Sequence, residues 1–162
     1  MAKKSIRASV QTTIKKRAED RHEVFMAFAN PQYSVMVDPS TISATLIGGE
    51  PMSKGAKYEI QVKNPLPGAG PIKETQEYTA FDPPYHLTID IQQDSMSGPE
   101  DETFGIDADG WITVHWIANY ELSGAMALPG VSSLIEKTVQ KKSQVWIDNM
   151  AKAIEAGRKP PE

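Results

Sequence analysis

The segment ITVHWIANYEL, residues 112–122, alternates apolar and polar side chains from end to end. A period of two indicates a β-strand with one buried face. After a short linker, the segment from about Pro129 to Ala156 has the spacing of a helix, which Gly157 and Pro160 end. At roughly 1.5 Å per residue this helix is about 40 Å long, enough to lie across a whole sheet face. The two segments therefore predict an α+β fold in which a long helix packs on a sheet.

Six further segments with the same alternation complete the predicted sheet, and two short helices interrupt it. The strands are expected at about 6–14, 41–46, 56–62, 72–81, 85–92 and 102–107, and the last of these has the weakest alternation. A first helix is expected to begin near Asp20 and to end at Asn30-Pro31, and a short helical turn follows from Tyr33 to Val37.

The terminal helix is expected to turn one stripe of side chains toward the sheet. The expected stripe consists of Leu134, Ile135, Thr138, Val145, Trp146, Met150, Ala153 and Ile154. The middle of the helix, 138–144, is polar for a segment that covers a core. Thr138 is therefore expected either to face a cavity or to lie on a solvent-facing turn.

The composition is that of an ordinary globular domain. The chain has 162 residues, 40% of them hydrophobic and 23% charged, and its net charge of −4 at pH 7 disfavours nucleic acid as a partner. The absence of cysteine excludes disulfides and thiolate metal sites. No segment approaches the roughly 20 apolar residues of a membrane span, and the N-terminus lacks the apolar run of a signal peptide. We expect one cytoplasmic domain at 1–157 with a tail at 158–162, as a monomer or weak homodimer.

Three local motifs, taken with the order of the elements, carry a family resemblance. They are the strand-to-helix junction at 17–25, the double-proline turn FDPPYHL at 81–87, and WIDNM at 146–150 with Glu155. Over about 5–155 the chain resembles the START-like helix-grip superfamily (SRPBCC), and within it the polyketide cyclase/dehydrase-type and lipid-transport-like domains. The resemblance implies a curved seven-stranded antiparallel sheet wrapped around the long C-terminal helix.

The resemblance also implies a ligand site, because members bind lipids, sterols, polyketides or hormones between sheet and helix, and a few catalyse ring closure there. Large amphipathic side chains on inward faces suit such a ligand, since each offers apolar area and one hydrogen-bond donor. The residues expected to contact a hydrophobic or amphiphilic small molecule are Tyr58, Ile60, Val62, Tyr78, Leu87, Ile89, Val114, Trp116, Tyr120, Thr138 and Trp146.

One end of the predicted sheet has longer loops than the other. Alternate connections of a meander fall at opposite ends, and those at 64–71, 95–101 and 123–129 are long, rich in Gly and Pro, and partly apolar. Their apolar side chains either pack on neighbouring helices or form movable flaps over a ligand. The candidate gate residues are Leu66, Pro67, Met96, Met126 and Leu128. The acidic run at 99–102 is expected to be a solvated loop.

The sequence has no convincing catalytic set. The three histidines are far apart and no phosphate-binding or nucleophile-elbow motif is present, so neither a metal nor a cofactor is expected. The strand at 72–81 is unusual because it carries polar residues in both registers. A carboxyl buried there would be costly and could act as a general base, which makes Glu74 and Glu77 the candidate catalytic residues.

Three functions therefore remain open. The leading one is binding or carriage of a hydrophobic or amphiphilic, lipid- or polyketide-like molecule without catalysis. The second is a cyclase or dehydratase acting on a polyketide-like substrate. The third is a protein-interaction module, which the polar outward positions of the third strand, such as Lys57 and Glu59, disfavour.

Overall fold

The computed structural model describes residues 2–64 and 68–161. Along the chain, the strands are β1 (Lys3–Ile14), β2 (Thr41–Gly48), β3 (Lys57–Val62), β4 (Ile72–Asp82), β5 (His86–Gln92), β6 (Met96–Ile106) and β7 (Ile112–Ser123). The helices are α1 (Arg21–Ala29), α2 (Pro31–Val37) and α3 (Pro129–Glu155), with short 3-10 turns at η1 (Ala18–Asp20) and η2 (Gly124–Ala127). Among the described residues, no helix is long and apolar enough to cross a membrane.

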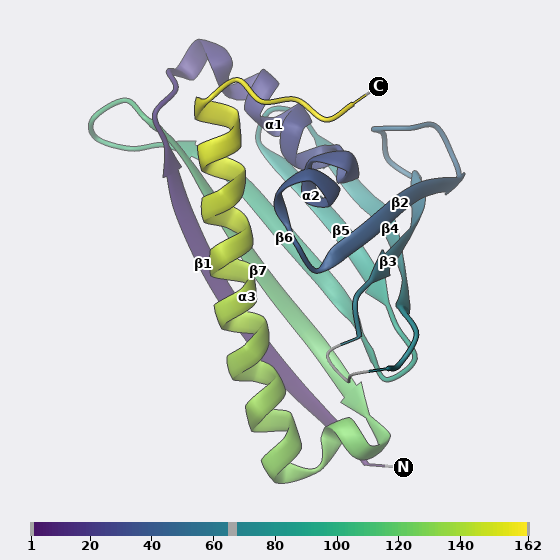
Figure 1. Cartoon of the computed structure of the whole chain (residues 1–162). Coiled ribbons are helices and arrows are strands. Elements are labelled where there is room, and N and C mark those ends of the chain that lie inside the picture. Colours follow the sequence, from purple (N-terminus) through teal and green to yellow (C-terminus); the bar gives the residue numbers. More distant parts are fainter. Residues whose placement is uncertain (1, 65–67, 162) are drawn as a thin grey trace.

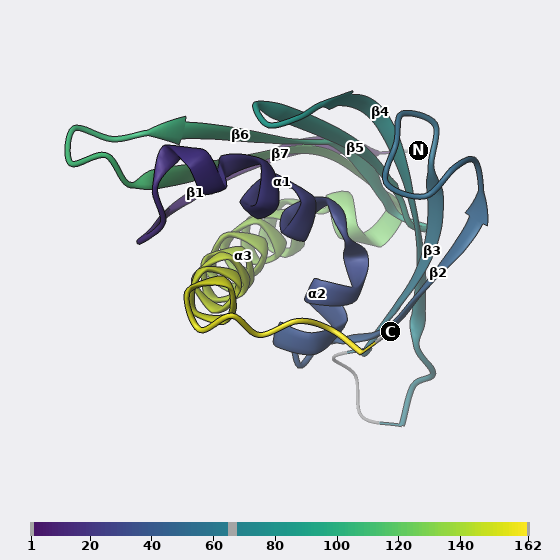
Figure 2. The same ribbon diagram turned by 90° about the horizontal axis from the view of Figure 1, so that it is seen from above.

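The seven strands form one antiparallel sheet in the order β1-β7-β6-β5-β4-β3-β2. The first strand of the chain pairs with the last, from Lys3 opposite Ser123 to Ile14 opposite Ile112, and the remaining strands follow as a meander. The sheet curves around α3, and α1 and α2 lie on the same concave side (Figures 1 and 2). The predicted fold class, an α+β helix-grip fold, is confirmed.

Alternation along the strands sends one set of side chains into this concave side. In β7 every second residue from Ile112 to Leu122 is buried, as the sequence predicts. Phe25 and Phe28 from α1 and Ile147 and Met150 from α3 close the core from the helical side. The outer face of β3 and β4 is polar instead, and carries the ion pairs Lys57–Glu77 (3.7 Å) and Lys73–Glu59 (3.8 Å).

Helix α3 runs along β1, which is an edge strand of the sheet (Figure 1). Three of its polar side chains bond the free backbone edge of β1. Glu136 accepts from the Arg7 N–H at 3.0 Å, and Gln144 donates to the Gln11 carbonyl at 3.1 Å. Gln140 both accepts from the Ser9 N–H (2.9 Å) and donates to its carbonyl (2.7 Å). An edge covered in this way cannot pair with another chain.

This edge contact explains why the middle of α3 is polar, and it corrects the predicted stripe. Leu134 is 65% exposed, Val145 is 51% exposed and Thr138 is also exposed. Among the core positions that the prediction missed is Ile147, which is 0% exposed. The prediction is right for Met150, Ala153 and Ile154, which are buried, and wrong for the three exposed residues, because the face of α3 that contacts the β1 edge is polar.

The sixth strand is longer than predicted. It begins at Met96, and the connection from β5 is a tight turn in which the Gln93 N–H bonds the Met96 carbonyl at 2.8 Å. The predictions of a long loop at 95–101 and of a solvated acidic loop at 99–102 are therefore wrong. The alternation is present in this segment, but its inward positions are Glu100 and Glu102 rather than apolar residues, so a hydrophobic period could not reveal it.

Candidate ligand-binding cavity

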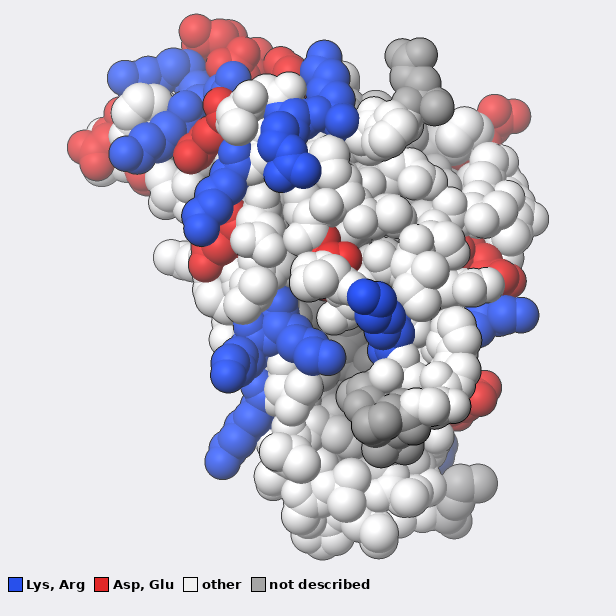
Figure 3. Space-filling view, viewed as in Figure 1, with Lys and Arg blue, Asp and Glu red and all other residues white. Residues whose placement is uncertain are grey.

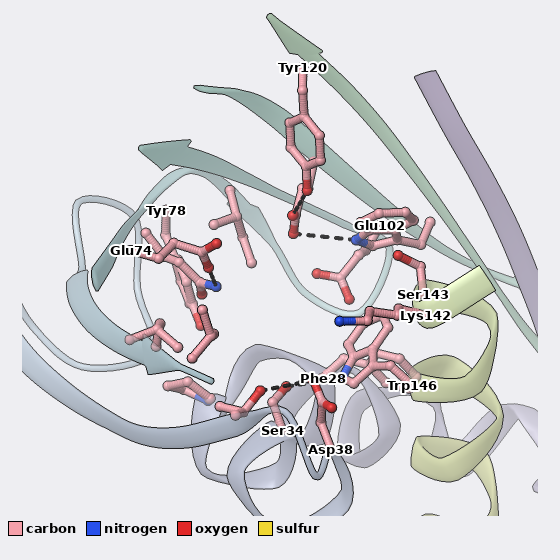
Figure 4. Close-up of a pocket in the computed structure, with 18 residues that line it drawn as sticks. Phe28, Ser34, Asp38, Glu74, Tyr78, Glu102, Tyr120, Lys142, Ser143 and Trp146 are labelled. Atoms are coloured by element: carbon pink, nitrogen blue, oxygen red, sulfur yellow. Dashed lines mark hydrogen bonds between the residues drawn. The ribbon is translucent and has the colours of Figure 1, made fainter. Parts of the chain in front are cut away.

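A cavity of about 200 Å³ lies between the concave face of the sheet and the helices (Figure 4). The sheet contributes side chains from six neighbouring strands, β2 to β7, and all three helices contribute the opposite wall. The lining residues are Phe28, Pro31, Ser34, Asp38, Thr41, Ile60, Val62, Glu74, Gln76, Tyr78, Ile89, Glu100, Glu102, Trp116, Tyr120, Lys142, Ser143 and Trp146. The cavity therefore has aromatic and aliphatic walls together with an unusual number of acidic groups.

Aromatic rings form the wall between α1, α3 and β7. Trp146 makes edge contacts with Phe28 (5.8 Å between centroids) and with Trp116 (6.2 Å). The Trp146 indole N–H also donates to the Ser34 hydroxyl at 3.0 Å, which ties α3 to α2. These contacts fix two indole rings at the edge of the cavity.

Glu100 on β6 accepts hydrogen bonds from two aromatic side chains of β7. The Tyr120 hydroxyl donates to one carboxyl oxygen, and the Trp116 indole N–H donates to the other at 3.3 Å. Both donors come from the neighbouring strand, on which Ala118 pairs with Glu100 and lies between them. The sheet register itself therefore places both donors on this carboxyl.

Glu102 lies two residues further along β6, on the same face, and is 2% exposed. Its Oε1 atom is buried and has no hydrogen-bond partner among the described residues. Figure 4 shows its carboxyl directed into the cavity, on the side where Lys142 extends from α3. An unpaired buried carboxyl oxygen is costly and needs an explanation.

Glu74 on β4 completes the acidic group from the other side of the cavity. It accepts hydrogen bonds from the side-chain amides of Gln76 (2.7 Å) and Gln93 (2.8 Å). On the same strand, the Tyr78 hydroxyl donates to the Ala29 carbonyl at the end of α1, at 2.5 Å. That bond ties β4 to the helical wall.

Burial shifts all three carboxyls in the same direction. Burial, and secondarily the charge of Glu74, raises the pKa of Glu100 to about 8, although the bonds from Tyr120 and Trp116 oppose the shift. Burial and the nearby Glu100 raise the pKa of Glu102 well above its ordinary value. Burial also raises the pKa of Glu74, against the bonds from the two glutamines. At neutral pH, the empty cavity therefore holds Glu100 mainly as a neutral acid.

Two charged side chains lie where the cavity meets the surface. Asp38, at the end of α2, is held by the Ser40 N–H and the Thr41 hydroxyl, both at 2.9 Å. Lys142 is exposed, and in Figure 4 its amine extends from α3 toward the cavity. None of the ion pairs found among the described residues joins Lys142 to the buried glutamates.

The structure brings together most of the residues that the sequence predicts to contact a ligand. Those that line the cavity are Ile60, Val62, Tyr78, Ile89, Trp116, Tyr120 and Trp146. Tyr58, Leu87 and Val114 are buried in the core without lining the cavity, and Thr138 is exposed on α3. Of the two candidate catalytic residues, Glu74 faces the cavity, whereas Glu77 lies on the outer face beside Lys57.

The structure describes three of the five predicted gate residues. Leu66 and Pro67 lie outside the described residues. Met96 belongs to β6, Met126 is half-buried in η2, and Leu128 is exposed just before α3. Figure 3 shows Lys and Arg along α3 and near the C-terminus, whereas the end where η2 leads into α3 is formed by uncharged side chains.

Sequence reasoning missed Glu100 and Glu102, the two most deeply placed carboxyls. A signal was present, because both alternate with Pro99, Asp101 and Thr103 and precede Phe104 at the same spacing. Polar residues at every second position before a buried aromatic predict a strand whose inner face is polar. Read in that way, the run at 99–102 would have pointed to a functional cavity.

The comparisons with known proteins bear on the fold. No family model matches the chain, and no curated protein matches it. Among solved structures, a conserved protein from Geobacillus kaustophilus is 16% identical with a TM-score of 0.73, covering 96% of this chain and 98% of that one. Ara h 8.0201 is 12% identical with a TM-score of 0.71, and the match covers 94% of this chain and 99% of that one. Major latex-like protein 151 from Panax ginseng is 17% identical with a TM-score of 0.62, and the match covers 99% of this chain and 100% of that one.

These likenesses extend over whole chains, so they show that the entire chain has the helix-grip fold of these structures. At such low identities they show the fold alone. The fold agrees with the one that the family resemblance implies, and the choice of ligand has to be argued from the cavity of this chain.

Proposed function

We propose that the protein binds a compact amphiphilic small molecule in the cavity between its sheet and α3. The supporting observation is a hollow with aromatic walls and a buried carboxyl whose oxygen has no partner among the described residues. Concave sites with mostly apolar walls and a few convergent polar groups are the usual form of a small-molecule site.

The volume argues for a smaller ligand than a lipid or polyketide. At roughly 30 Å³ per water, the cavity of about 200 Å³ has room for about seven waters. Typical sites for drug-sized ligands measure roughly 300–1,000 Å³. A single aromatic ring with a short polar side chain matches this space, and a long acyl chain would need the helices to separate.

Tryptophan fluorescence tests this proposal directly, because two of the three indoles line the cavity. The third, Trp111, lies at the far hairpin under the Arg17 guanidinium (4.1 Å), and Trp111→Phe removes its signal. In that background we expect a saturable fluorescence change when 2-phenylethanol is titrated. Ile89→Phe fills the cavity and should abolish the change, whereas Ile42→Phe, on an exposed position of β2, should leave it intact. Equal binding by the filled variant would contradict the proposal.

A second candidate function is proton-transfer catalysis of the cyclase or dehydratase type. It is favoured by Glu100, because a carboxyl with a pKa of about 8 can both give and take a proton near neutral pH. The Tyr120 hydroxyl beside it is a donor that could polarise a carbonyl.

This candidate is tested by hydrogen–deuterium exchange next to the carbonyl of 4-phenylbutan-2-one in D2O, followed by NMR. Catalysis predicts faster exchange with the wild-type protein and a loss of at least a hundredfold in Glu100→Gln, with the ketone still bound. Exchange at the rate of the buffer would leave binding as the function.

A further inference from the structure

Three glutamates line one cavity, and of these Glu102 is buried, whereas Glu74 and Glu100 are half-buried. Glu74 approaches from β4 and Glu102 from β6 (Figure 4), and Glu100, also on β6, lines the same cavity. None of them takes part in the ion pairs formed among the described residues. Buried acidic groups in proteins are normally paired or hydrogen-bonded, since an unpaired charge in a low-dielectric interior is strongly disfavoured. No ion pair in the described part of the chain therefore stabilises the ionised forms of these three carboxyls.

The three glutamates differ in their hydrogen bonds, and only Glu102 has a carboxyl oxygen without a partner among the described residues. Glu74 is satisfied by two amides, and Glu100 by a hydroxyl and an indole N–H. Glu102 Oε1 has no partner within the described residues, although it is fully enclosed by protein and faces the cavity. In its ionised form this carboxylate oxygen can only accept, so the partner that would stabilise the ionised Glu102 is a hydrogen-bond donor.

The surroundings favour an organic cation over a metal ion. Within the described part of the chain, no group of three or more His, Cys, Asp or Glu side chains is arranged to hold a metal. The remaining walls include aromatic and aliphatic side chains, and the indole rings of Trp116 and Trp146 line the same space. Aromatic rings stabilise ammonium groups and accommodate an apolar body equally well.

We propose that the cavity selects a compact amine, with its ammonium group on Glu102 and Glu100 and its apolar body against the indole rings of Trp116 and Trp146. This inference rests on the proposed binding function and specifies the chemical class of the ligand. An ammonium group supplies the donors that Glu102 lacks, and its charge offsets the mutual repulsion of the carboxyls.

Every titratable group that faces the ammonium position contributes to the pH dependence of binding. These groups are Glu74 and Tyr78 on β4, Glu100 and Glu102 on β6, Tyr120 on β7, Asp38 after α2 and Lys142 on α3. Burial keeps Glu100 largely protonated below about pH 8, and the amine binds best to the ionised carboxylate. Amine affinity should therefore rise from pH 6 to pH 8, and binding at pH 7 should release a proton.

The test compares three probes of similar size: 2-phenylethylamine, 2-phenylethanol and phenylacetate. With the fluorescence signal described above, we expect the amine to bind at least tenfold more tightly than the alcohol at pH 7.5, and phenylacetate to bind most weakly. Calorimetry in two buffers of different ionisation enthalpy measures the released proton. Equal affinity for amine and alcohol, or a preference for phenylacetate, overturns the inference while the proposed binding function stands.

Glutamine variants of single glutamates identify which carboxyl makes the cavity prefer an amine over an alcohol. Glu102→Gln should weaken amine binding at least tenfold and leave alcohol binding unchanged, which also shows that the variant is folded. The matched control is Glu77→Gln, on the outer face beside Lys57, which should change neither affinity. Unchanged amine affinity in Glu102→Gln overturns the inference, and failure of all three probes to bind the wild-type protein overturns both proposals.

The Lys142 amine is the other cation that could pair with Glu102, and a Lys142 variant distinguishes this pairing from the binding of an external amine. It lies at the mouth of the cavity and is exposed, so its removal should tighten amine binding modestly and leave stability nearly unchanged. If Lys142 were instead the permanent partner of Glu102, Lys142→Met would lower the thermal unfolding midpoint at pH 7 strongly. Such a loss of stability would contradict the assignment of an external amine to this position.

Discussion

Glu100 and Glu102 occupy positions on β6 where a β-sheet protein would ordinarily place core residues. They alternate with outward Asp101 and lead into the buried Phe104. Burial disfavours the ionised carboxylate of both residues. The charge of Glu74 further raises the pKa of Glu100, and the charge of Glu100 raises the pKa of Glu102. Such a costly arrangement within a cavity is typical of a functional site.

The pKa of Glu100 predicts a pH dependence of stability. The carboxyl binds its proton more tightly in the folded protein (pKa about 8) than in the unfolded chain (4.5). Its stabilising contribution is therefore complete below about pH 4.5 and is lost as the pH rises to 8, by up to about 5 kcal/mol. Glu100→Gln should match the wild type near pH 5 and exceed its unfolding free energy at pH 8.5.

Urea denaturation at a series of pH values measures this difference. Glu77→Gln is the control, because Glu77 lies on the outer face and its replacement should leave the slope with pH unchanged. Parallel stability curves for Glu100→Gln and the wild type would mean that the Glu100 carboxyl is solvated rather than buried.

Individual residues were predictable where the hydrophobic pattern applied. Trp116, Tyr120 and Trp146 were expected to face a ligand space, and all three line the cavity. Glu100 and Glu102 were not expected there, because a run of acidic residues ordinarily indicates a solvated loop. Carboxyl groups stand at inward positions of β6 in place of apolar residues, and this removed the pattern on which the prediction depends.

At the scale of elements, α3 has two different contact faces. One is apolar and packs in the core through Ile147, Met150 and Ile154. The other is polar, and its side chains at positions 136, 140 and 144, four residues apart, bond the edge of β1. A spacing of four keeps these residues on one side of a helix. Helix α3 thus completes the sheet edge as well as covering the core.

The edge contact can be tested at Gln140, which bonds both backbone groups of Ser9. Gln140→Ala should speed amide hydrogen exchange at Ser9 at least tenfold and cost about 1 kcal/mol of unfolding free energy. Lys141→Ala, at the next and exposed position, should leave the Ser9 amide protected. Equal protection in both variants would indicate that β1 does not depend on α3 for its outer hydrogen bonds.

The corrected orientation of α3 gives a second test. Ile147→Ala removes a side chain that is 0% exposed and should cost about 2–5 kcal/mol. Val145→Ala, at a position that is 51% exposed, should stay within about 0.5 kcal/mol of the wild type. Thermal and urea unfolding of both variants checks the difference. A larger loss at Val145 would support the stripe predicted from the sequence over the observed one.

The elements themselves were largely predictable, because strands β1, β3, β5 and β7 alternate cleanly and Pro129 and Gly157 bound the long helix. The orientation of α3 was not predictable from apolar spacing, since part of its buried contact is polar. The pairing of β1 with β7 was not predicted, because a period of two does not specify a strand's partner.

At the scale of the whole molecule, the curved sheet and its three helices enclose a space whose chemistry differs from both the core and the surface. The outer sheet face carries exposed ion pairs, and the core is apolar, whereas the cavity holds three glutamates beside indole rings. A ligand that binds only the folded protein raises its stability in proportion to the logarithm of ligand concentration. The empty molecule should therefore gain stability from an amine most at pH values near 8.

The central claim is that the space between sheet and helix holds three carboxyls with raised pKa values, one of which, Glu102, has an oxygen without a partner among the described residues. NMR titration of the glutamate side-chain carboxyl carbons, assigned with Glu74→Gln, Glu100→Gln and Glu102→Gln, measures this directly. We expect Glu100 to titrate at about pH 8 in the free protein, with Glu102 also well above its ordinary range, and both to titrate lower with 2-phenylethylamine bound. Titration of all three carboxyls near pH 4.5, unaffected by the amine, would contradict the account.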